Sequence, residues 1–319
     1  MIKKIAVLTS GGDAPGMNAA VRVVIRTALY YGLEAYVVYD GYRGLVDGNI
    51  IQVHKEFTQD IINRGGTIIG TARCPEFMDP KVVKRAARNL KDLDIDALVG
   101  IGGDGTFRGL KDLAEAGINV VGVPATIDND VASSDETIGF STALNTICEC
   151  IDRIKDTSTS HQRCSLIEVM GHHCGDLALY SSIAEAAELV VTHDHHLSDE
   201  EICKRLRKLR VQKKGHAVVV VSEKLLDIRA LADKIREDTG FETKVEILGH
   251  LQRGGAPSAH DRILASLMGS KAVECLVQGE SKKIICMYHN DVIVRDIDEA
   301  LSMKHDSHEE MLKLVNILQ

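Results

Sequence analysis

The sequence predicts an α/β fold in two lobes, each built around a mostly parallel sheet. Short runs rich in β-branched residues alternate with stretches that have the apolar period of a helix. This succession of strand, turn, helix and strand is typical of parallel α/β sheets. The chain has 319 residues, which is more than one hydrophobic core usually supports, so two lobes are expected.

The first strand is predicted at Ile5 to Leu8, and the apolar spacing from Ala20 to Tyr31 predicts the helix that follows it. Ser198 and Glu201 form a capping-box pattern, which predicts a helix ending at about Lys213. The other predicted strands are Ala35 to Tyr39, Ala97 to Ile101, Asn119 to Val123, Cys164 to Val169, Leu189 to Val191 and His216 to Val221.

The composition excludes several classes of protein. Apolar residues make up 45% and charged residues 26% of the chain, as in ordinary globular proteins. The net charge of -8 disfavours broad binding to nucleic acid or anionic membranes. We find no run near the roughly 20 apolar residues of a membrane span. The 8 cysteines lack CxxC spacing, so free thiols and a cytoplasmic location are expected.

Two glycine-rich segments follow predicted strands, where ligands of open parallel sheets bind. In Thr9 to Gly16, glycines let backbone N–H groups approach a phosphate, although a tight connection is the alternative interpretation. Gly102 to Thr106 adds Asp104, a candidate ligand for Mg²⁺ shared with nucleotide phosphates. This loop also resembles that of NAD kinases and lipid kinases, so it predicts phosphoryl transfer without selecting the acceptor.

A third segment, Pro124 to Asp130, places two carboxylates on either side of an amide directly after a predicted strand. One carboxylate could accept the proton of an attacking hydroxyl while the other positions metal or backbone. A turn made of helix-capping residues is the alternative interpretation.

Together with five further segments, these motifs resemble the bacterial ATP-dependent phosphofructokinases that ADP and phosphoenolpyruvate regulate. The similarity runs nearly end to end. The further segments are INRGGT at 62–67, TAR at 71–73, SHQR at 160–163, EVMG at 168–171 and LGHLQRGG at 248–255.

The resemblance implies two Rossmann-like lobes, with 1–138 plus 251–304 binding ATP and 139–250 plus 305–319 binding the sugar phosphate. It implies a glycolytic kinase that phosphorylates the 1-hydroxyl of fructose 6-phosphate, with Mg²⁺ on Asp104. The implied ATP-binding residues are Gly12, Arg73, Cys74, Gly103, Asp104, Gly105 and Thr106.

In this resemblance Asp128 is the base, and Thr126, Asp130 and His172 support the phosphoryl group or the base. Arg163 would come from a neighbouring subunit of a homotetramer. The implied substrate-binding residues are Thr126, Ile127, Asp128, Arg163, Met170, Gly171, His172, Glu223, Lys244, His250, Leu251, Gln252 and Arg253.

The resemblance also implies a site where ADP activates and phosphoenolpyruvate inhibits. Arg22 and Arg26 lie four residues apart and therefore on one face of a predicted helix. The alternative interpretation of this pair is an ordinary solvated surface. The implied effector-binding residues are Arg22, Arg26, Lys55, Lys155, Glu188 and Lys214.

Some residues depart from the family pattern. His172 and Lys244 stand where the family usually has arginines, and Lys55 and Lys155 likewise replace effector-site arginines. A weakly active or regulatory paralogue is therefore the alternative function. Gly105 and Ala125 replace the Asp and Lys of pyrophosphate-using relatives, which favours ATP as the donor.

Two histidine-rich stretches, 172–174 and 193–196, lack the spacing of a closed zinc site, so a structural metal is not expected.

Overall fold

The computed structural model describes residues 2–305 and 308–318, which form two compact units. Of the segment 305–319 assigned to the second lobe from sequence, residues 306–307 and 319 lie outside this description. Unit 1 comprises Met1–Ile127, Val131–Thr142 and Arg253–His305, and unit 2 comprises Asp128–Asp130, Ala143–Gln252 and Asp306–Gln319. Each unit is described by itself below.

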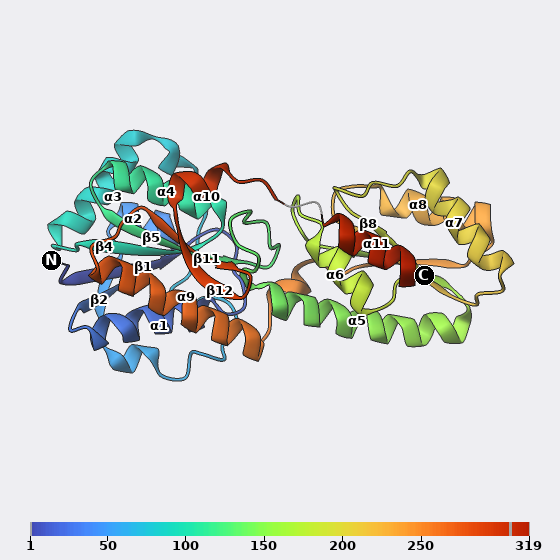
Figure 1. The fold of residues 1–319 in the computed structure, drawn as a ribbon, viewed down its shortest axis with the longest axis horizontal. Helices are drawn as coiled ribbons and strands as arrows, with labels where there is room; N and C mark the ends of the chain where they lie inside the picture. Colours follow the sequence, from blue (N-terminus) through green and yellow to red (C-terminus); the bar gives the residue numbers. More distant parts are fainter. Residues whose placement is uncertain (1, 306–307, 319) are drawn as a thin grey trace. The chain divides into compact units, whose positions relative to one another are not determined.

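Unit 1 is built on an eight-stranded sheet (Figure 1). The edge strands β3 and β12 run antiparallel to their neighbours, and the strands between them are parallel. In spatial order the strands are β12 (Asp291–Asp296), β11 (Lys283–Tyr288), β5 (Asn119–Thr126), β4 (Ala97–Gly102), β1 (Lys4–Thr9), β2 (Glu34–Val38) and β3 (Ile50–Val53), and β6 (Ile138–Gly139) pairs with β5.

Helices cover both faces of this sheet (Figure 1). The pair α1 (Met17–Tyr30) and α9 (Ala259–Val277) packs on one face. The other face buries side chains of the remaining helices against the strand residues Leu8, Leu98 and Val120. These helices are α2 (Gly41–Asp47), α3 (Pro80–Asp92), α4 (Asp104–Glu115) and α10 (Ile297–Ser302), with the short 3₁₀ turns η1 (Lys55–Thr58) and η2 (Pro75–Met78).

Buried Asp261 connects the first turn of α9 to the start of α5 (Phe140–His161). Its Oδ1 accepts a hydrogen bond from the amide of Gly139 at 2.8 Å, and its Oδ2 accepts one from the amide of Thr142 at 2.8 Å. Desolvation raises the pKa of Asp261, because these bonds offset only part of the cost of burying its charge. The carboxylate therefore satisfies amides that a helix start leaves without intrahelical partners.

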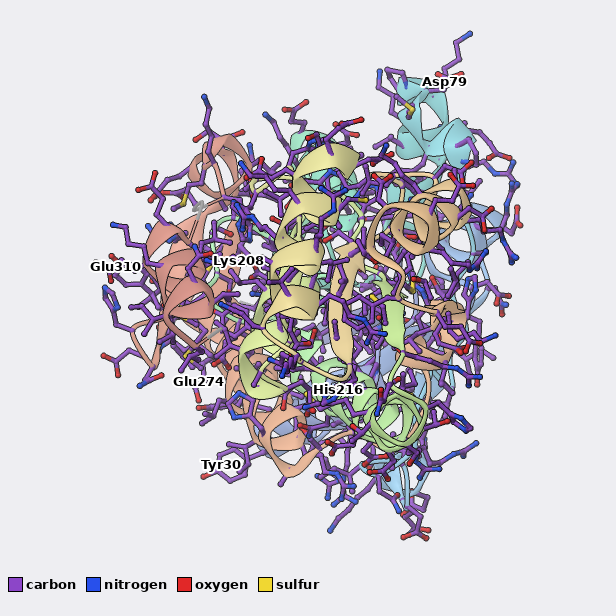
Figure 2. The ribbon with its side chains drawn as sticks, turned by 90° about the vertical axis from the view of Figure 1, so that its right-hand side faces the viewer. Tyr30, Asp79, Lys208, His216, Glu274 and Glu310 are labelled. Atoms are coloured by element: carbon purple, nitrogen blue, oxygen red, sulfur yellow. The ribbon has the colours of Figure 1, made fainter. Side chains whose placement is uncertain are left out.

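Unit 2 has a four-stranded, wholly parallel sheet in the order β10 (Thr243–Ile247), β7 (Cys164–Val169), β9 (Ala217–Ser222) and β8 (Leu189–Val191). Figure 2 shows Lys208 on the exposed side of α7 and His216 just before β9. The helices are α5, α6 (Asp176–Ala184), α7 (Asp199–Val211), α8 (Ile228–Thr239) and α11 (Glu309–Leu318), and η3 (Gly249–Arg253) follows β10.

The seven strands predicted from sequence are confirmed within a few residues of their ends. Ser198 caps α7 by accepting a hydrogen bond from the amide of Glu201 at 3.3 Å, as predicted, but the helix ends at Val211 rather than Lys213. Strands β3, β6, β10, β11 and β12 were not predicted: β3, β10 and β12 are edge strands and β6 has only two residues, whereas β11 is a mostly buried run of six residues that was overlooked. Among the described residues, we find no helix of the length and apolar character that crossing a membrane requires.

Candidate nucleotide and sugar-phosphate sites

The two glycine-rich segments meet in unit 1 because β1 and β4 are parallel neighbours. The amide of Ser10 donates to the carbonyl of Ile101 at 3.0 Å, and Thr106 Oγ1 donates to the carbonyl of Ser10 at 3.1 Å. A Cβ at Gly102 would overlap the Ser10 carbonyl and the Thr106 hydroxyl, so only glycine fits there. The chain crosses to opposite sides of β1, which makes this point a ligand-binding crevice in α/β sheets.

The start of α4 combines helix amides with a carboxylate. Gly103 precedes the helix and has no side chain to cap it, so the first N–H groups of α4 can donate to a phosphate. The side chain of Asp104 is 39% exposed and lies 3.7 Å from Arg108 Nη2. A half-exposed carboxylate beside a phosphate-binding turn fits a hard divalent cation that also contacts phosphate oxygens.

Other predicted residues converge on the first glycine-rich segment of unit 1. Thr71 Oγ1 donates to the carbonyl of Gly11 at 3.0 Å, and Arg253 Nη1 donates to the carbonyl of Asp13 at 3.3 Å. A Cβ at Gly12 would overlap the Arg253 guanidinium, so Gly12 and Arg253 lie in direct proximity. The structure thus brings residues near 12, 71 and 253 together.

Buried Asn18 of α1 holds the loop at residues 64–68, a role that was not predicted from the sequence. Its Nδ2 donates to the carbonyls of Arg64 and Gly65 at 3.0 and 3.2 Å, and its Oδ1 accepts from the amide of Ile68 at 2.7 Å. A single Asn in an amphipathic helix gives no sequence signal for such bonds.

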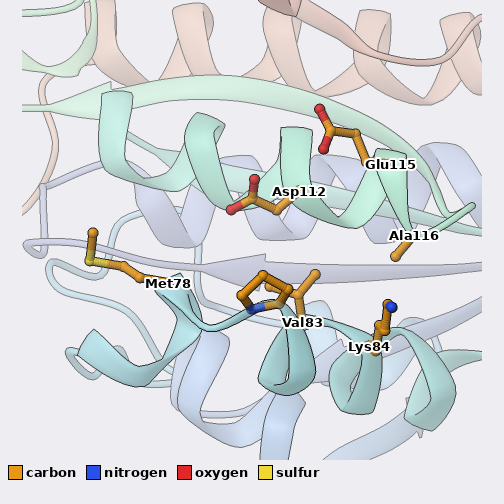
Figure 3. A pocket seen from close by; sticks show the side chains of 7 residues that line it. Met78, Val83, Lys84, Asp112, Glu115 and Ala116 are labelled. Carbon is orange, nitrogen blue, oxygen red and sulfur yellow. The ribbon is translucent and has the colours of Figure 1, made fainter.

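A cavity of about 290 Å³ lies between α3 and α4 in unit 1 (Figure 3). It begins at Met78, the last residue of η2, and Cys74 precedes that turn. Arg73 is exposed and Cys74 is half-buried. Desolvation, followed by the charge of nearby Glu115, raises the pKa of Asp112 in the cavity wall. The lining residues are Met78, Pro80, Val83, Lys84, Asp112, Glu115 and Ala116.

In unit 2, predicted sugar-phosphate residues gather at the carboxyl ends of β7, β9 and β10. The amide of His172 donates to Glu223 Oε1 at 3.2 Å. The amide of Met170 donates to Oε1 of fully buried Gln252 at 3.1 Å. Gly171 has φ 145°, and a Cβ there would overlap the Cys174 carbonyl. His250 and Leu251 are exposed in the same η3 turn.

The carboxylate turn begins where β5 ends. Thr126 is the last residue of β5, and its carbonyl accepts a hydrogen bond from Thr137 Oγ1 at 2.7 Å. Ile127 and Asp128 follow and are buried, with Asp128 only 7% exposed. Asp130 Oδ2 lies 3.5 Å from His172 Nδ1 within unit 2. The predicted base and its supporting carboxylate therefore occupy one short turn.

Arg163 and Lys244 lie at the opposite, amino edge of the unit 2 sheet. Arg163 directly precedes β7, and Lys244 is the second residue of β10. Arg163 Nε lies 3.0 Å from Glu242 Oε2, and Lys244 Nζ lies 3.2 Å from Glu242 Oε1. At about 3.3 Å per residue, Arg163 is roughly 23 Å along β7 from Met170. The predicted substrate residues of unit 2 therefore form two separate groups.

The predicted effector residues fall into groups within each unit. In unit 1, Arg26 of α1 donates to Thr58 Oγ1, which in turn donates to the Lys55 carbonyl at 2.7 Å; Arg22 lies one turn earlier on α1. In unit 2, Lys214 Nζ lies 2.6 Å from Oε1 of buried Glu188. Lys155 pairs separately with Glu185 at 3.3 Å.

Within unit 2, His173 brings the two histidine-rich stretches into contact. Its ring lies 4.3 Å from that of His172 and 5.5 Å from that of His193, between centroids. This contact was not predicted from sequence, because the stretches lie on different loops.

Two glycine-rich loops after parallel strands, and a buried carboxylate turn after β5, are the features expected of an α/β phosphotransferase. Residues 4–276 match the Phosphofructokinase family model, and the chain belongs to that family. It is an ATP-dependent kinase that phosphorylates fructose 6-phosphate in glycolysis. The family resemblance found from sequence is thereby confirmed, and the interpretation as an NAD or lipid kinase is set aside.

The chain is 50% identical over 319 residues to the ATP-dependent 6-phosphofructokinase of Photobacterium profundum, covering 100% of both chains. It is 49% identical over 318 residues to the enzyme of the same description from Clostridium botulinum (strain Alaska E43 / Type E3), covering 99% of each. The solved phosphofructokinase of Saccharomyces cerevisiae is 35% identical, with a TM-score of 0.87; the match covers 99% of this chain and 46% of that one.

Proposed function

We propose that Asp128 takes the proton from the 1-hydroxyl of fructose 6-phosphate as that oxygen attacks the γ-phosphoryl group of ATP. The observation that supports this most is the burial of Asp128. The turn that carries it is fixed by a hydrogen bond from the next residue, Asn129, to Asp176. Proton acceptance by a positioned carboxylate contributes typically 100- to 10,000-fold to rate. Asp128 gains the proton as the new P–O bond forms and the bond to ADP breaks.

His172, Asp130 and Thr126 support this step. His172 lies beside Asp130, so its imidazole can donate to a phosphoryl oxygen while Asp130 orients the ring. Thr126 ends β5 two residues before the base, and its hydroxyl is a further donor for the transferring group. A histidine offers fewer donors than the arginine usual in the family, so we expect chemistry slower than an arginine would give.

ATP binds in unit 1, on the loops after β1 and β4. Gly12, Gly103 and Gly105 supply backbone N–H groups to the phosphates, and Thr106 holds the loop in place through the carbonyls of Gly103 and Ser10. When bound, Mg²⁺ neutralises charge on the phosphates, and Asp104 holds it. Arg73 and Cys74 contact the nucleotide beyond the phosphates, and its base enters the cavity that starts at Met78.

The sugar phosphate contacts Met170, Gly171 and Glu223, together with the turn from His250 to Gln252 and Arg253. Arg163 and Lys244 are too far along the sheet from these residues to grip the same molecule, since a sugar phosphate is much shorter than roughly 23 Å. We infer that they bind the 6-phosphate in a neighbouring copy. The enzyme is therefore a homo-oligomer, in our proposal a tetramer, whose sites are completed between subunits.

A second site binds ADP as activator and phosphoenolpyruvate as inhibitor. It consists of five cationic residues and one carboxylate: Arg22, Arg26, Lys55, Lys155, Lys214 and Glu188. Each effector would act by binding one arrangement of subunits more tightly than the other. Lysines at 55 and 155 lack the bidentate fork of arginine, so the effector response should be weak. The 8 free thiols agree with a cytoplasmic enzyme.

The test is ADP formation from ATP, Mg²⁺ and fructose 6-phosphate, measured for the wild type, Asp128→Ser and His172→Arg. We expect Asp128→Ser to abolish turnover and His172→Arg to preserve or raise it. Asp227→Ser, at the start of α8, is a control for the same chemical change elsewhere. Substantial turnover by Asp128→Ser would remove Asp128 as the base.

A further inference from the structure

Glu242 is a carboxylate held between the two cations that the proposed function assigns to the 6-phosphate. Its Oε2 lies 3.0 Å from Arg163 Nε, and its Oε1 lies 3.2 Å from Lys244 Nζ. The two oxygens thus engage one cation each. No sequence motif had assigned Glu242 a role.

The position of Glu242 follows from strand pairing. β10 lies parallel to β7 with Thr243 opposite Cys164 and Lys244 opposite Ser165. The amide of Cys164 donates to the Glu242 carbonyl at 3.0 Å, which places Arg163 and Glu242 side by side at the amino edge. The ion-pair contacts with Arg163 and then Lys244 hold the pKa of Glu242 below its ordinary value. The carboxylate is therefore charged at neutral pH.

A phosphate that binds Arg163 and Lys244 competes with Glu242 for them, because Glu242 already engages Nε of Arg163 and one donor of Lys244 Nζ. A phosphate dianion and a carboxylate prefer the same donors, and a guanidinium can form its bidentate contact with only one of them at a given edge. Within its own subunit the side chain of Glu242 is 49% exposed, so the packing of that subunit leaves it room to turn away from the two cations. The residual negative charge beside the phosphate still opposes binding.

We propose that Glu242 is a built-in competitor for the sugar phosphate, which occupies Arg163 and Lys244 until the 6-phosphate displaces it and thereby sets the affinity for that substrate. This inference rests on the proposed role of Arg163 and Lys244. It assigns Glu242 as a specificity-determining residue, because only a ligand with more charge than a carboxylate would displace it effectively.

The experiment compares Glu242→Gln with wild type in full-length enzyme, by calorimetric binding of fructose 6-phosphate and by steady-state kinetics. Removing the charge while keeping the shape should tighten sugar-phosphate binding about 3- to 10-fold, as expected for losing an exposed ion pair and a like-charge contact. The kcat and the KM for ATP should not change. Glu242→Asp keeps the charge and should stay near wild type.

Glu237→Gln is the matched control, because Glu237 is exposed on α8 of the same unit and the charge change is identical. It should leave the affinity unchanged. In the double variant Arg163→Ala with Lys244→Ala, adding Glu242→Gln should give no further tightening. Equal tightening there, or in Glu237→Gln, would mean a general charge effect and overturn the inference.

Two further results would overturn the proposed competition. Weaker binding of fructose 6-phosphate by Glu242→Gln would mean that Glu242 positions the cations, and unchanged binding would mean that it plays no part. The Arg163→Ala variant distinguishes failure of the proposed function from failure of this inference. If Arg163→Ala does not weaken binding of fructose 6-phosphate, the assignment of Arg163 is wrong and the inference fails with it. If Arg163→Ala weakens binding but Glu242→Gln does not tighten it, only the inference fails.

Discussion

The side-chain amide of Asn129 donates a 2.8 Å hydrogen bond to Oδ2 of Asp176. Asn129 has φ 54°, a left-handed conformation that Asn tolerates better than most residues, and it immediately follows Asp128. Asp176 is 1% exposed, and its Oδ1 lies 3.1 Å from His308 Nε2. A buried carboxylate therefore anchors the turn that carries the proposed base.

We predict that Asp176→Ala lowers kcat about 10- to 100-fold, because small displacements of a catalytic group are costly. The KM for ATP should change little, since the nucleotide loops belong to unit 1. Steady-state kinetics would measure both, and circular dichroism would check that the variant folds. An unaltered kcat in a folded Asp176→Ala enzyme would contradict the anchoring role.

Gly105→Asp should abolish use of ATP without harming the fold. A Cβ at this position meets no atom within 4 Å in the described structure, and Asp in the first turn of α4 favours the helix. The new charge would repel the ATP phosphates, so kcat/KM for ATP should fall more than about 100-fold. The midpoint of thermal unfolding should stay within a few degrees. Gly105→Ala serves as the uncharged control and should keep most activity.

Lys244→Arg should increase the affinity for fructose 6-phosphate. Arginine restores the planar fork that grips phosphate at two points, and one charge-assisted hydrogen bond is worth about 1.5 to 3 kcal/mol. The corresponding gain is roughly ten- to hundredfold in the KM for the sugar, with kcat nearly constant. Because Glu242 competes for the same cation, the gain in affinity should be nearer tenfold than hundredfold. No gain in sugar affinity would count against Lys244 as a phosphate ligand.

Asp261→Ala should lower the free energy of unfolding by about 2 to 5 kcal/mol, because it leaves the buried amides of Gly139 and Thr142 without their acceptor. Asp261→Asn keeps one acceptor oxygen and should be less damaging. Urea denaturation followed by circular dichroism measures both. Equal stability of Asp261→Ala and wild type would show that water replaces the carboxylate.

The buried thiols should make stability fall at high pH. Burial raises the pKa of Cys164 to about 12 and that of Cys286 to about 11, from an ordinary value of 9.0. Because the folded-state pKa is the higher one, their contribution to stability is complete below pH 9 and is lost as the pH rises through 11 to 12. Circular dichroism at increasing alkaline pH follows this loss.

The same shift predicts slow alkylation of the native protein, since the thiolate is the reactive form. At mildly alkaline pH, iodoacetamide should modify half-buried Cys74 well before Cys164 or Cys286, as mass spectrometry would show. In urea all three should react at similar rates. Fast modification of Cys164 in the folded protein would refute the assigned burial.

Local patterns were sufficient to predict most strands and the loops that bear chemistry. The apolar runs at Ala97 to Gly102 and Cys164 to Val169 predict strands because they are short and contain β-branched side chains, which favour extended backbone. Gly102 to Thr106 and Thr126 to Asp130 were recognisable because glycines or carboxylates directly after a strand stand where parallel sheets bind ligands. The family assignment followed from the order of such segments.

Tertiary structure alone decided which residues meet. Lys244 lies opposite Ser165 only because β10 pairs with β7, and no local pattern encodes the choice of so distant a partner strand. That pairing sets Lys244 beside Arg163 at the amino edge of the sheet and places Glu242 between the two cations. Asp176 likewise had no predicted role, and only packing brought it to Asn129. Sequence determined the chemical groups, whereas long-range packing determined their distances.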